Sequence, residues 1–268
     1  MKKSLTLFVA ALLVAFTGCK NAKQAEGCEN TDAVAVFDTI TVAEEFPMDT
    51  IDSNSPKLEV KISLLVPRES DTESLANKNN CITYAAFGYE NITPRAAIDS
   101  IITSLKENYY SMRDEYINEK DIYPDSPRFT AYYYLKSDAK NGKDGIVCYT
   151  VNYEAYEGGA HPYHITSVVN FDEKSGKEIT LQDVFTENCD SLLTDRLTHR
   201  LAEQQGVASL QELQDKGYLY MCDMFITNNF KLEKDSIFFI YNIYEIAPYA
   251  LGESHIGFKY DELKDLLK

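Results

Sequence analysis

Alternation between apolar and polar side chains is the feature that most constrains how this chain folds. The pattern is clearest over residues 58–66, where every second residue is apolar: Leu58, Val60, Ile62, Leu64 and Val66. A period of two is typical of an extended strand with one buried face and one face in water. Further strand patterns cover residues 34–42, 129–135, 146–156, 164–171, 237–244 and 255–259. The chain is therefore predicted to build its core around half-buried sheets.

Helical patterns lie between these groups of strands. Thr93 and Pro94 have the residue types of a helix N-cap and first turn, and apolar residues then recur every three or four positions, which predicts one long helix over 94–119. Capping-box residues at 180–183 open a short turn of helix, and Leu193, Leu197 and Leu201 mark another. Short helices are also expected near 209–217 and 261–267. The predicted fold class is α+β, with mainly antiparallel sheets packed by helices.

The first residues are typical of a targeting segment. Lys2 and Lys3 precede an apolar run over 5–16 that is too short for a permanent membrane span, and Gly18-Cys19 follows. This order predicts a lipoprotein signal peptide over 1–18 and lipidation of Cys19, which would hold the protein on a membrane of the bacterial cell envelope, on its periplasmic or outer surface. The alternative is an ordinary secretory signal in which Cys19 is incidental. Residues 19–33 are mostly polar and are predicted to be a tether.

Composition excludes several classes of protein. The 268 residues include 42 acidic and 26 basic side chains, for a net charge of −16, so nucleic acid is not an expected partner. The 19 Tyr and 13 Phe indicate a globular body rather than a disordered acidic chain. Five cysteines remain besides Cys19, an odd number without metal-ligand spacing, and Cys148 lies in an apolar run that favours a core position. No disulfide framework is predicted.

The segment 153–164 is the most unusual part of the sequence. Gly158 and Gly159 allow close approach of a ligand, and Pro162 restricts His161 to an extended conformation. Three interpretations remain: a metal site using His161, His164 and Glu157, a general acid/base pair, or a turn that contacts a ligand or is only structural. No zincin motif or nucleophile signature accompanies the segment, which disfavours the first two. We therefore predict no metal, no cofactor and no catalytic residue.

A second dense segment covers residues 238–252. It combines aromatic residues with Asn242 and Glu245 and ends in a Pro/Gly turn. Tyrosine and asparagine suit contacts with sugars or with a protein surface, because they combine a flat apolar face with hydrogen-bonding groups. Alternation along a strand predicts that half of these aromatic residues belong to the core.

Three motifs together carry a family resemblance. They are the EGGAHP loop at 157–162, the stretch from Asn170 to Phe185, and residues 241–252. In order and spacing they resemble the extracytoplasmic domain of unknown function of RsiV-type anti-sigma factors, which is also found beside peptidoglycan deacetylases of the PdaC type. The resemblance implies a C-terminal RsiV-like α+β domain over 141–268. The preceding part, 34–140, is similar to the smaller α/β domain that often precedes it.

The resemblance implies a non-enzymatic sensor or binding module, which in RsiV binds lysozyme. This sequence has no sigma-binding segment, transmembrane helix or deacetylase domain, so we expect a stand-alone lipoprotein. Its predicted partner is an envelope glycan or a lysozyme-like protein, and its acidic charge would speed encounter with a basic protein. The alternatives are a hydrolase of wall polymers using Glu157 and His161, and a structural envelope scaffold. The predicted ligand-binding residues are Tyr156, Glu157, Gly158, Gly159, His161, Tyr244, Glu245 and Tyr249.

Overall fold

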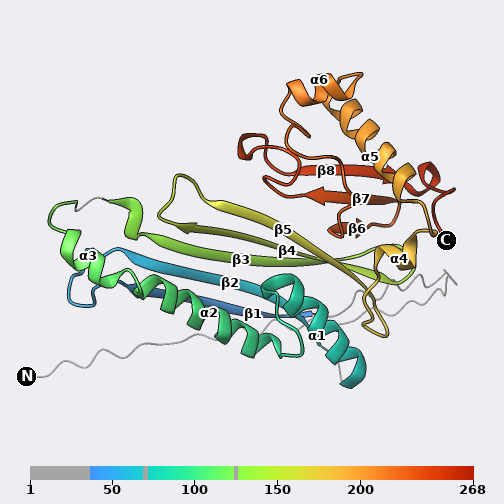
Figure 1. The fold of residues 1–268 in the computed structure, drawn as a ribbon. Coiled ribbons are helices and arrows are strands. Elements are labelled where there is room, and N and C mark those ends of the chain that lie inside the picture. Colours follow the sequence, from blue (N-terminus) through green and yellow to red (C-terminus); the bar gives the residue numbers. More distant parts are fainter. Residues whose placement is uncertain (1–36, 69–71, 124–125) are drawn as a thin grey trace, which may run out of the picture. The chain divides into compact units, whose positions relative to one another are not determined.

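The computed structural model describes residues 37–68, 72–123 and 126–268 (Figure 1). Val34–Lys268 forms one compact unit. The predicted signal peptide, Cys19, Cys28 and the tether lie outside the described residues. No helix in the described part of the chain is long and apolar enough to cross a membrane.

Five strands form the larger sheet, in the order β1-β2-β3-β4-β5 (Figure 1). Neighbouring strands are antiparallel except β2 and β3, which are parallel. The predicted boundary between 140 and 141 lies in the β3–β4 hairpin, where Lys140 pairs with Cys148, so one sheet extends across it. The strands are β1 (Phe37–Pro47), β2 (Lys57–Pro67), β3 (Ala131–Asn141), β4 (Ile146–Glu157) and β5 (Tyr163–Asp172).

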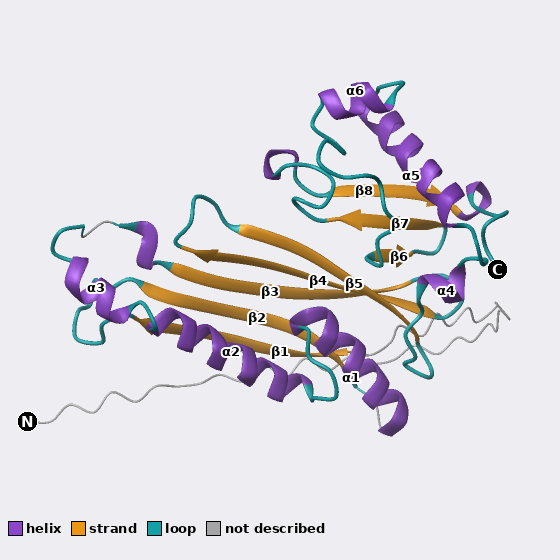
Figure 2. Cartoon of the chain, in the orientation of Figure 1, coloured by secondary structure: helices purple, strands orange, loops and turns teal. Residues whose placement is uncertain are grey.

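Three helices connect β2 to β3 and provide the crossover that a parallel pair requires. They are α1 (Thr72–Phe87), α2 (Pro94–Tyr110) and α3 (Arg113–Glu119). Figure 2 shows α1 and α2 on one face of the sheet. There the alternate residues of β2 from Leu58 to Leu64 are buried against Ile82 and Ile98, as the period of two predicts. The opposite face of the sheet carries the polar set, including Glu59 and Lys61.

The prediction of one helix over 94–119 is wrong, because α2 ends at Tyr110 and α3 begins at Arg113. Between them the Ser111 hydroxyl donates to the Asn108 carbonyl (2.7 Å), which offers the backbone an alternative to the helical ladder. Tyr109 and Tyr116 are nevertheless buried in the same core. The apolar spacing therefore continues across a break in the helix.

The C-terminal part packs helices on a three-stranded antiparallel sheet. Leu193, Leu197 and Leu201 of α5 are buried there, as their spacing predicts. The capping-box interaction before α4 is also confirmed, since the Thr180 amide donates to Asp183 (2.9 Å). The elements are α4 (Leu181–Val184), α5 (Asp190–Gln205), α6 (Leu210–Asp215), β6 (Phe230–Leu232), β7 (Ser236–Tyr241) and β8 (Ser254–Lys259). Together the two sheets and their helices confirm the α+β class.

The predicted terminal helix over 261–267 is wrong. A 3-10 turn covers Tyr260–Glu262, and one further turn follows it, in which the Leu266 and Leu267 amides donate to the Leu263 carbonyl (2.8 and 3.2 Å). The backbone then bonds to the α4–α5 segment. The Leu266 carbonyl accepts from the Thr186 amide (2.8 Å), and the Lys268 amide donates to the Val184 carbonyl (3.0 Å). The end of the chain is therefore paired as an antiparallel bridge between Phe185 and Leu267 and does not continue as a helix.

Asparagine side chains join β5 to the smaller sheet in place of strand pairing, and we call Asn170, Asn229 and Asn242 the asparagine ladder. The Asn242 amide accepts from the Thr166 N–H (2.8 Å) and donates to the Thr166 carbonyl (3.1 Å). Asn229 accepts from the Val168 N–H (2.8 Å), and Asn170 donates to the Phe230 carbonyl (2.7 Å). The ladder thereby fixes the C-terminal part against the strand that leads out of the 157–162 loop.

Candidate functional site

The two motif-rich segments meet in space. The Nε2 atom of His161 lies 3.2 Å from the Tyr244 hydroxyl, although 83 residues separate them. The imidazole also stacks on the Tyr249 ring, with centroids 3.7 Å apart and planes 21° apart. We call His161, Tyr244 and Tyr249 the ring cluster. His161 and Tyr244 are exposed and Tyr249 is half-buried, so the cluster forms an aromatic, hydrogen-bonding surface open to solvent.

The loop between β4 and β5 holds His161 through short-range contacts. The Tyr156 hydroxyl donates to the Gly159 carbonyl (2.8 Å), which closes the loop. Gly158 has φ +79°, and a Cβ at this position would collide with the Arg128 backbone, so glycine is required. His161 Nδ1 lies 3.1 Å from the Pro162 carbonyl. Because a carbonyl can only accept, Nδ1 carries the proton in the neutral ring and Nε2 accepts from Tyr244.

The opposing turn holds Tyr244 in a left-handed conformation with φ +68°. Such a backbone costs a residue with a Cβ roughly 1–2 kcal/mol. The turn is maintained by the Glu245 carboxylate, which accepts from the Asn242 backbone N–H (2.7 Å), and by the Tyr244 backbone N–H, which donates to the Ala247 carbonyl (3.1 Å). Glu245 therefore lies behind the ring cluster, where it shapes the turn. Burial and, less strongly, the nearby Glu253 raise the pKa of its carboxyl group.

A cavity of about 760 Å³ lies on the helix side of the same hairpin. Glu157, Gly159 and His161 contribute to its lining, and the other walls are mostly apolar or aromatic. Tyr133 and Tyr153 stack in this wall with centroids 5.8 Å apart, and burial raises the pKa of Tyr153. The apolar wall includes Phe87, Ile101, Leu105, Tyr133, Tyr153, Tyr163 and Ile165. A mostly apolar cavity with a few polar groups has the composition typical of a small-ligand site. We call it the hairpin cavity.

His161 and His164 have different partners. His164 Nδ1 lies 3.6 Å from the Glu154 carboxylate, whereas His161 contacts Pro162 and Tyr244. Glu157 is exposed and bonds to neither ring nitrogen of His161. Within residues 37–68, 72–123 and 126–268, no group of three His, Cys, Asp or Glu side chains is placed to hold a metal ion.

The structure thus distributes the predicted site residues over four positions. His161, Tyr244 and Tyr249 form the ring cluster, and Glu157 and Gly159 line the hairpin cavity with His161. Tyr156 and Gly158 shape the loop, and Glu245 shapes the turn. Sequence reasoning missed four polar or aromatic residues beside these positions: Tyr132, Tyr134, Glu154 and Glu253. The signal available was the run Tyr132-Tyr133-Tyr134, in which alternation must direct two of three tyrosines away from the helices.

The four cysteines among the described residues contribute no site chemistry that the geometry supports. Cys81, Cys148, Cys189 and Cys222 are free thiols, and all but Cys222 are buried. Cys148 contacts the Leu232 carbonyl through Sγ (2.9 Å), and burial raises the pKa of its thiol to about 11. A thiol with so high a pKa is a poor nucleophile, which agrees with the core position predicted from the sequence.

Comparison with known proteins identifies similar chains. Residues 182–261, which include the Tyr244 turn, match the family model described as "Protein of unknown function (DUF3298)". The crystal structure of a DUF3298 member from Bacteroides fragilis is 28% identical and has a TM-score of 0.78, covering 87% of this chain and 93% of that one. This chain resembles the DUF3298 family. A DUF3298 protein from Pseudomonas aeruginosa shares the fold with a TM-score of 0.57 at 16% identity, covering 87% of this chain and 95% of that one.

A curated relative extends the comparison beyond DUF3298 structures. The peptidoglycan-N-acetylmuramic acid deacetylase PdaC of Bacillus subtilis is 29% identical over 124 residues, which are 46% of this chain and 26% of that protein. The match thus spans about a quarter of PdaC's length. The resemblance predicted from the three motifs is confirmed.

Proposed function

We propose that this chain is a non-catalytic binding module of the bacterial cell envelope and that its ligand is a cell-wall glycan. The observation that carries the proposal is the ring cluster, in which two distant segments bring one imidazole and two phenol rings to an open surface. The strained backbone of Tyr244 supports a functional role, because residues with such a conformation occur most often at binding and active sites, where the surrounding structure holds them.

The chemistry of a glycan matches this surface. A pyranose ring has apolar C–H faces and a rim of hydroxyl groups, so it needs flat aromatic surfaces with hydrogen-bonding groups at their edges. The ring cluster supplies both. The adjacent hairpin cavity is mostly apolar and suits the methyl group of an N-acetyl substituent, while Glu157 supplies acceptors for hydroxyl groups. The similarity to part of an enzyme named for peptidoglycan N-acetylmuramic acid supports the same ligand class.

The proposal also includes the location of the protein. The basic start of the sequence, its short apolar run and Gly18-Cys19 support lipidation of Cys19. A lipid on Cys19 would hold the binding module close to a membrane and within reach of the wall. Mass spectrometry of the mature N-terminal peptide tests this part separately: an acylated Cys19 supports it, and an unmodified or internal terminus contradicts it.

Binding is favoured over hydrolysis by the partners of His161. Both ring nitrogens lie within hydrogen-bonding distance of groups other than Glu157, so the acid/base pair of the alternative hydrolase function is not assembled. A Glu157→Gln variant distinguishes the two functions. Glycan binding without release of reducing ends, by the wild type and by the variant alike, supports a binding module, whereas wall hydrolysis that the variant loses supports the hydrolase.

The direct test is sedimentation of the full chain with purified peptidoglycan. Tyr249→Ala removes the ring that stacks on His161, and we expect it to weaken binding about tenfold, the loss of one aromatic contact. Tyr123→Ala removes a tyrosine that is 61% exposed and lies outside both motif-rich segments, and it serves as the control for loss of a surface phenol ring. Binding that neither variant changes, or no binding by the wild type, would overturn the proposal.

A lysozyme-like protein is the second candidate, and the net charge of −16 favours it. Association of an acidic surface with a basic protein is steered electrostatically and weakens steeply with salt. Contacts between aromatic rings and a neutral sugar have little salt dependence. Measuring binding to lysozyme and to peptidoglycan at low and high salt therefore separates the two partners.

A further inference from the structure

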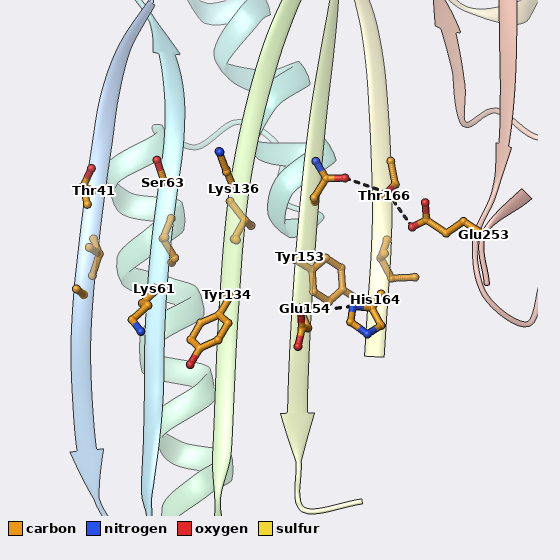
Figure 3. Close-up of a pocket in the computed structure, with 16 residues that line it drawn as sticks. Thr41, Lys61, Ser63, Tyr134, Lys136, Tyr153, Glu154, His164, Thr166 and Glu253 are labelled. Atoms are coloured by element: carbon orange, nitrogen blue, oxygen red, sulfur yellow. Dashed lines mark hydrogen bonds and ion pairs between the residues drawn. The ribbon is translucent and has the colours of Figure 1, made fainter. Parts of the chain in front are cut away.

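A cleft of about 660 Å³ lies on the face of the larger sheet opposite α1 and α2. Figure 3 shows its lining side chains projecting from all five strands, with the helices behind the sheet. One residue from each strand illustrates this arrangement: Thr41, Ser63, Lys136, Glu154 and Thr166. Glu253, which precedes β8, forms part of the same lining. We call this the sheet cleft.

Aromatic rings connect the sheet cleft to the ring cluster. Tyr134 lines the cleft and stacks on Tyr132 with centroids 4.6 Å apart and planes 16° apart. Tyr132 in turn stacks on Tyr156, 5.9 Å away, whose hydroxyl closes the 157–162 loop. A second connection runs through His164 in the cleft, whose ring lies 6.4 Å from that of Tyr249. Glu154 joins these two runs of rings, because it accepts from the Tyr132 hydroxyl and lies 3.6 Å from His164. We call the two runs with Glu154 the aromatic path, which links the two sites across β3, β4 and β5.

The charges in the sheet cleft balance, unlike those of the whole chain. Its lining contains two cations, Lys61 and Lys136, and two carboxylates, Glu154 and Glu253. Lys61 is also paired with Glu59 (2.5 Å) beside the cleft, so that two cations and three carboxylates lie in and next to it, a small net charge beside that of the whole chain. A charged ligand gains little from such a balanced lining, whereas a neutral ligand with many hydroxyl groups finds both donors and acceptors.

The acceptors are already held in place. Glu154 accepts from the Tyr132 hydroxyl and lies 3.6 Å from His164. Glu253 accepts from the Thr166 hydroxyl (2.8 Å) and contacts His255 (3.1 Å). Lys136 is exposed, and among the described residues it has no ion-pair partner, so its ammonium group remains available as a donor. Carboxylates fixed in this way retain further lone pairs for a ligand at little conformational cost.

We infer that the sheet cleft is a second sugar-binding subsite and that the ligand is an uncharged oligosaccharide strand long enough to occupy both the cleft and the ring cluster. This inference rests on the proposed function and extends it, because it specifies a neutral, multi-residue glycan. A disaccharide occupies the ring cluster alone. A longer strand follows the aromatic path onto Tyr134 and Lys136.

Calorimetric titration of the full chain with chitin disaccharide and chitin hexasaccharide tests the inference, since both sugars are uncharged and N-acetylated. We expect the hexasaccharide to bind about tenfold more tightly. Tyr134→Ala should remove that advantage and leave the affinity for the disaccharide unchanged. Lys136→Ala, at an exposed position that cannot disturb the core, should reduce hexasaccharide affinity selectively. Tyr249→Ala should weaken binding of both sugars, and Tyr123→Ala of neither.

The outcomes separate the inference from the proposed function. Equal affinity for both sugars, or a hexasaccharide affinity that neither Tyr134→Ala nor Lys136→Ala changes, overturns the sheet-cleft subsite while glycan binding at the ring cluster stands. Absence of binding to either sugar and to peptidoglycan overturns both. Thermal melting of each variant identifies any that fails to fold, and the Lys136 variant then decides the question.

Discussion

Tyr244 combines two properties that seldom occur in one residue, a left-handed backbone and an aromatic ring that is 57% exposed. Its ring gains little from burial, so packing gives no reason for an aromatic residue in a strained turn. A glycine would adopt the same conformation without the steric cost. The proposed function gives the ring a role, because together with the His161 imidazole and the Tyr249 phenol it would contact the ligand.

Replacing Tyr244 separates stability from binding. At φ +68°, Tyr244→Gly should be more stable than Tyr244→Ala by about 1 kcal/mol, because alanine keeps the steric cost and glycine relieves it. Both variants should lose affinity for peptidoglycan. Urea unfolding measures the first effect and sedimentation the second. If the alanine variant proves the more stable, the backbone is not strained in solution; if both variants bind as wild type, the ring has no role in recognition.

The contribution of Glu245 to the free energy of unfolding should depend on pH. Its pKa is raised above the ordinary 4.5, mainly by burial, so the folded state disfavours the carboxylate. Burial of Glu245 therefore does not reduce the free energy of unfolding below the ordinary pKa. The free energy of unfolding decreases as the pH rises from the ordinary pKa to the raised one. Glu245→Gln keeps a side-chain oxygen that can accept from the Asn242 backbone N–H. We expect this variant to be at least as stable as the wild type at pH 7, with any advantage disappearing near pH 4.

Glu245→Ala is the variant to compare with Glu245→Gln, because it removes the side-chain oxygen that accepts from the Asn242 backbone N–H in the turn. Its free energy of unfolding should fall by about 1 kcal/mol, the usual cost of losing a cap. A glutamine variant as unstable as the alanine variant at pH 7 would mean that the negative charge of Glu245 holds the turn, and that a neutral acceptor oxygen does not suffice. Urea unfolding of the three proteins at both pH values provides the comparison.

At the scale of elements, α1 shows why sequence patterns identify some structures and miss others. Most of the strands and α5 carry regular apolar spacing and lie where that spacing predicts, although β1 continues to Pro47 and the short strand β6 was not predicted. The buried face of α1 instead includes Ser74, Lys78 and Thr83, so no apolar period marks it. Its partner is the turn after β5, where Asn77 donates to the Ser175 carbonyl (3.0 Å). Contacts 98 residues apart leave no trace in local periodicity.

The same limit applies to the candidate site. The two segments that carry the ring cluster were recognisable from glycine, proline and aromatic content, but their contact depends on β4, β5 and the asparagine ladder. The sequence suggested Asn242 and Glu245 as contact groups because their side chains suit ligands. The structure uses both within the fold. The parallel pairing of β2 with β3 could not be predicted either. Apolar alternation indicates which face of a strand is buried, but it does not indicate which strand is its neighbour.

The asparagine ladder provides the element-scale prediction. Asn242→Ala removes both bonds to Thr166 and leaves the Thr166 N–H without a partner, whereas the Thr166 carbonyl keeps the Asn229 side chain as a donor (2.8 Å). We expect the free energy of unfolding to fall by about 2 kcal/mol. Asn228→Ala, one residue from the ladder's Asn229 and exposed, should change stability by less than about 0.5 kcal/mol. Guanidinium unfolding measures both. A loss at Asn242 no larger than at Asn228 would mean that the ladder does not hold the two sheets together.

At the scale of the whole unit, both sheets are needed to build the site. The 157–162 loop belongs to the five-stranded sheet, whereas Tyr244 and Tyr249 lie between β7 and β8 of the smaller one. Glu253 spans the junction, because its carboxylate accepts from Thr166 of β5 and contacts His255 of β8. The hydrogen bond from His255 is the main reason that the pKa of Glu253 is lowered, and the Thr166 bond acts in the same direction against burial.

The junction should therefore weaken in acid. Because the folded-state pKa of Glu253 lies below its ordinary 4.5, its contribution to stability is complete above that value and is lost as pH falls through the folded-state pKa. Glu253→Gln keeps an acceptor for Thr166 but loses the charge facing His255. At pH 6 we expect the variant to be less stable by at most about 1 kcal/mol, since the side chain is partly exposed and the interaction is screened. As the pH falls below 4.5, the difference in unfolding urea concentration between the two proteins should shrink. A deficit that stays constant from pH 6 to pH 3 would show that Glu253 acts through shape and hydrogen bonding alone, and that its charge does not help to hold the two sheets in the arrangement that forms the ring cluster.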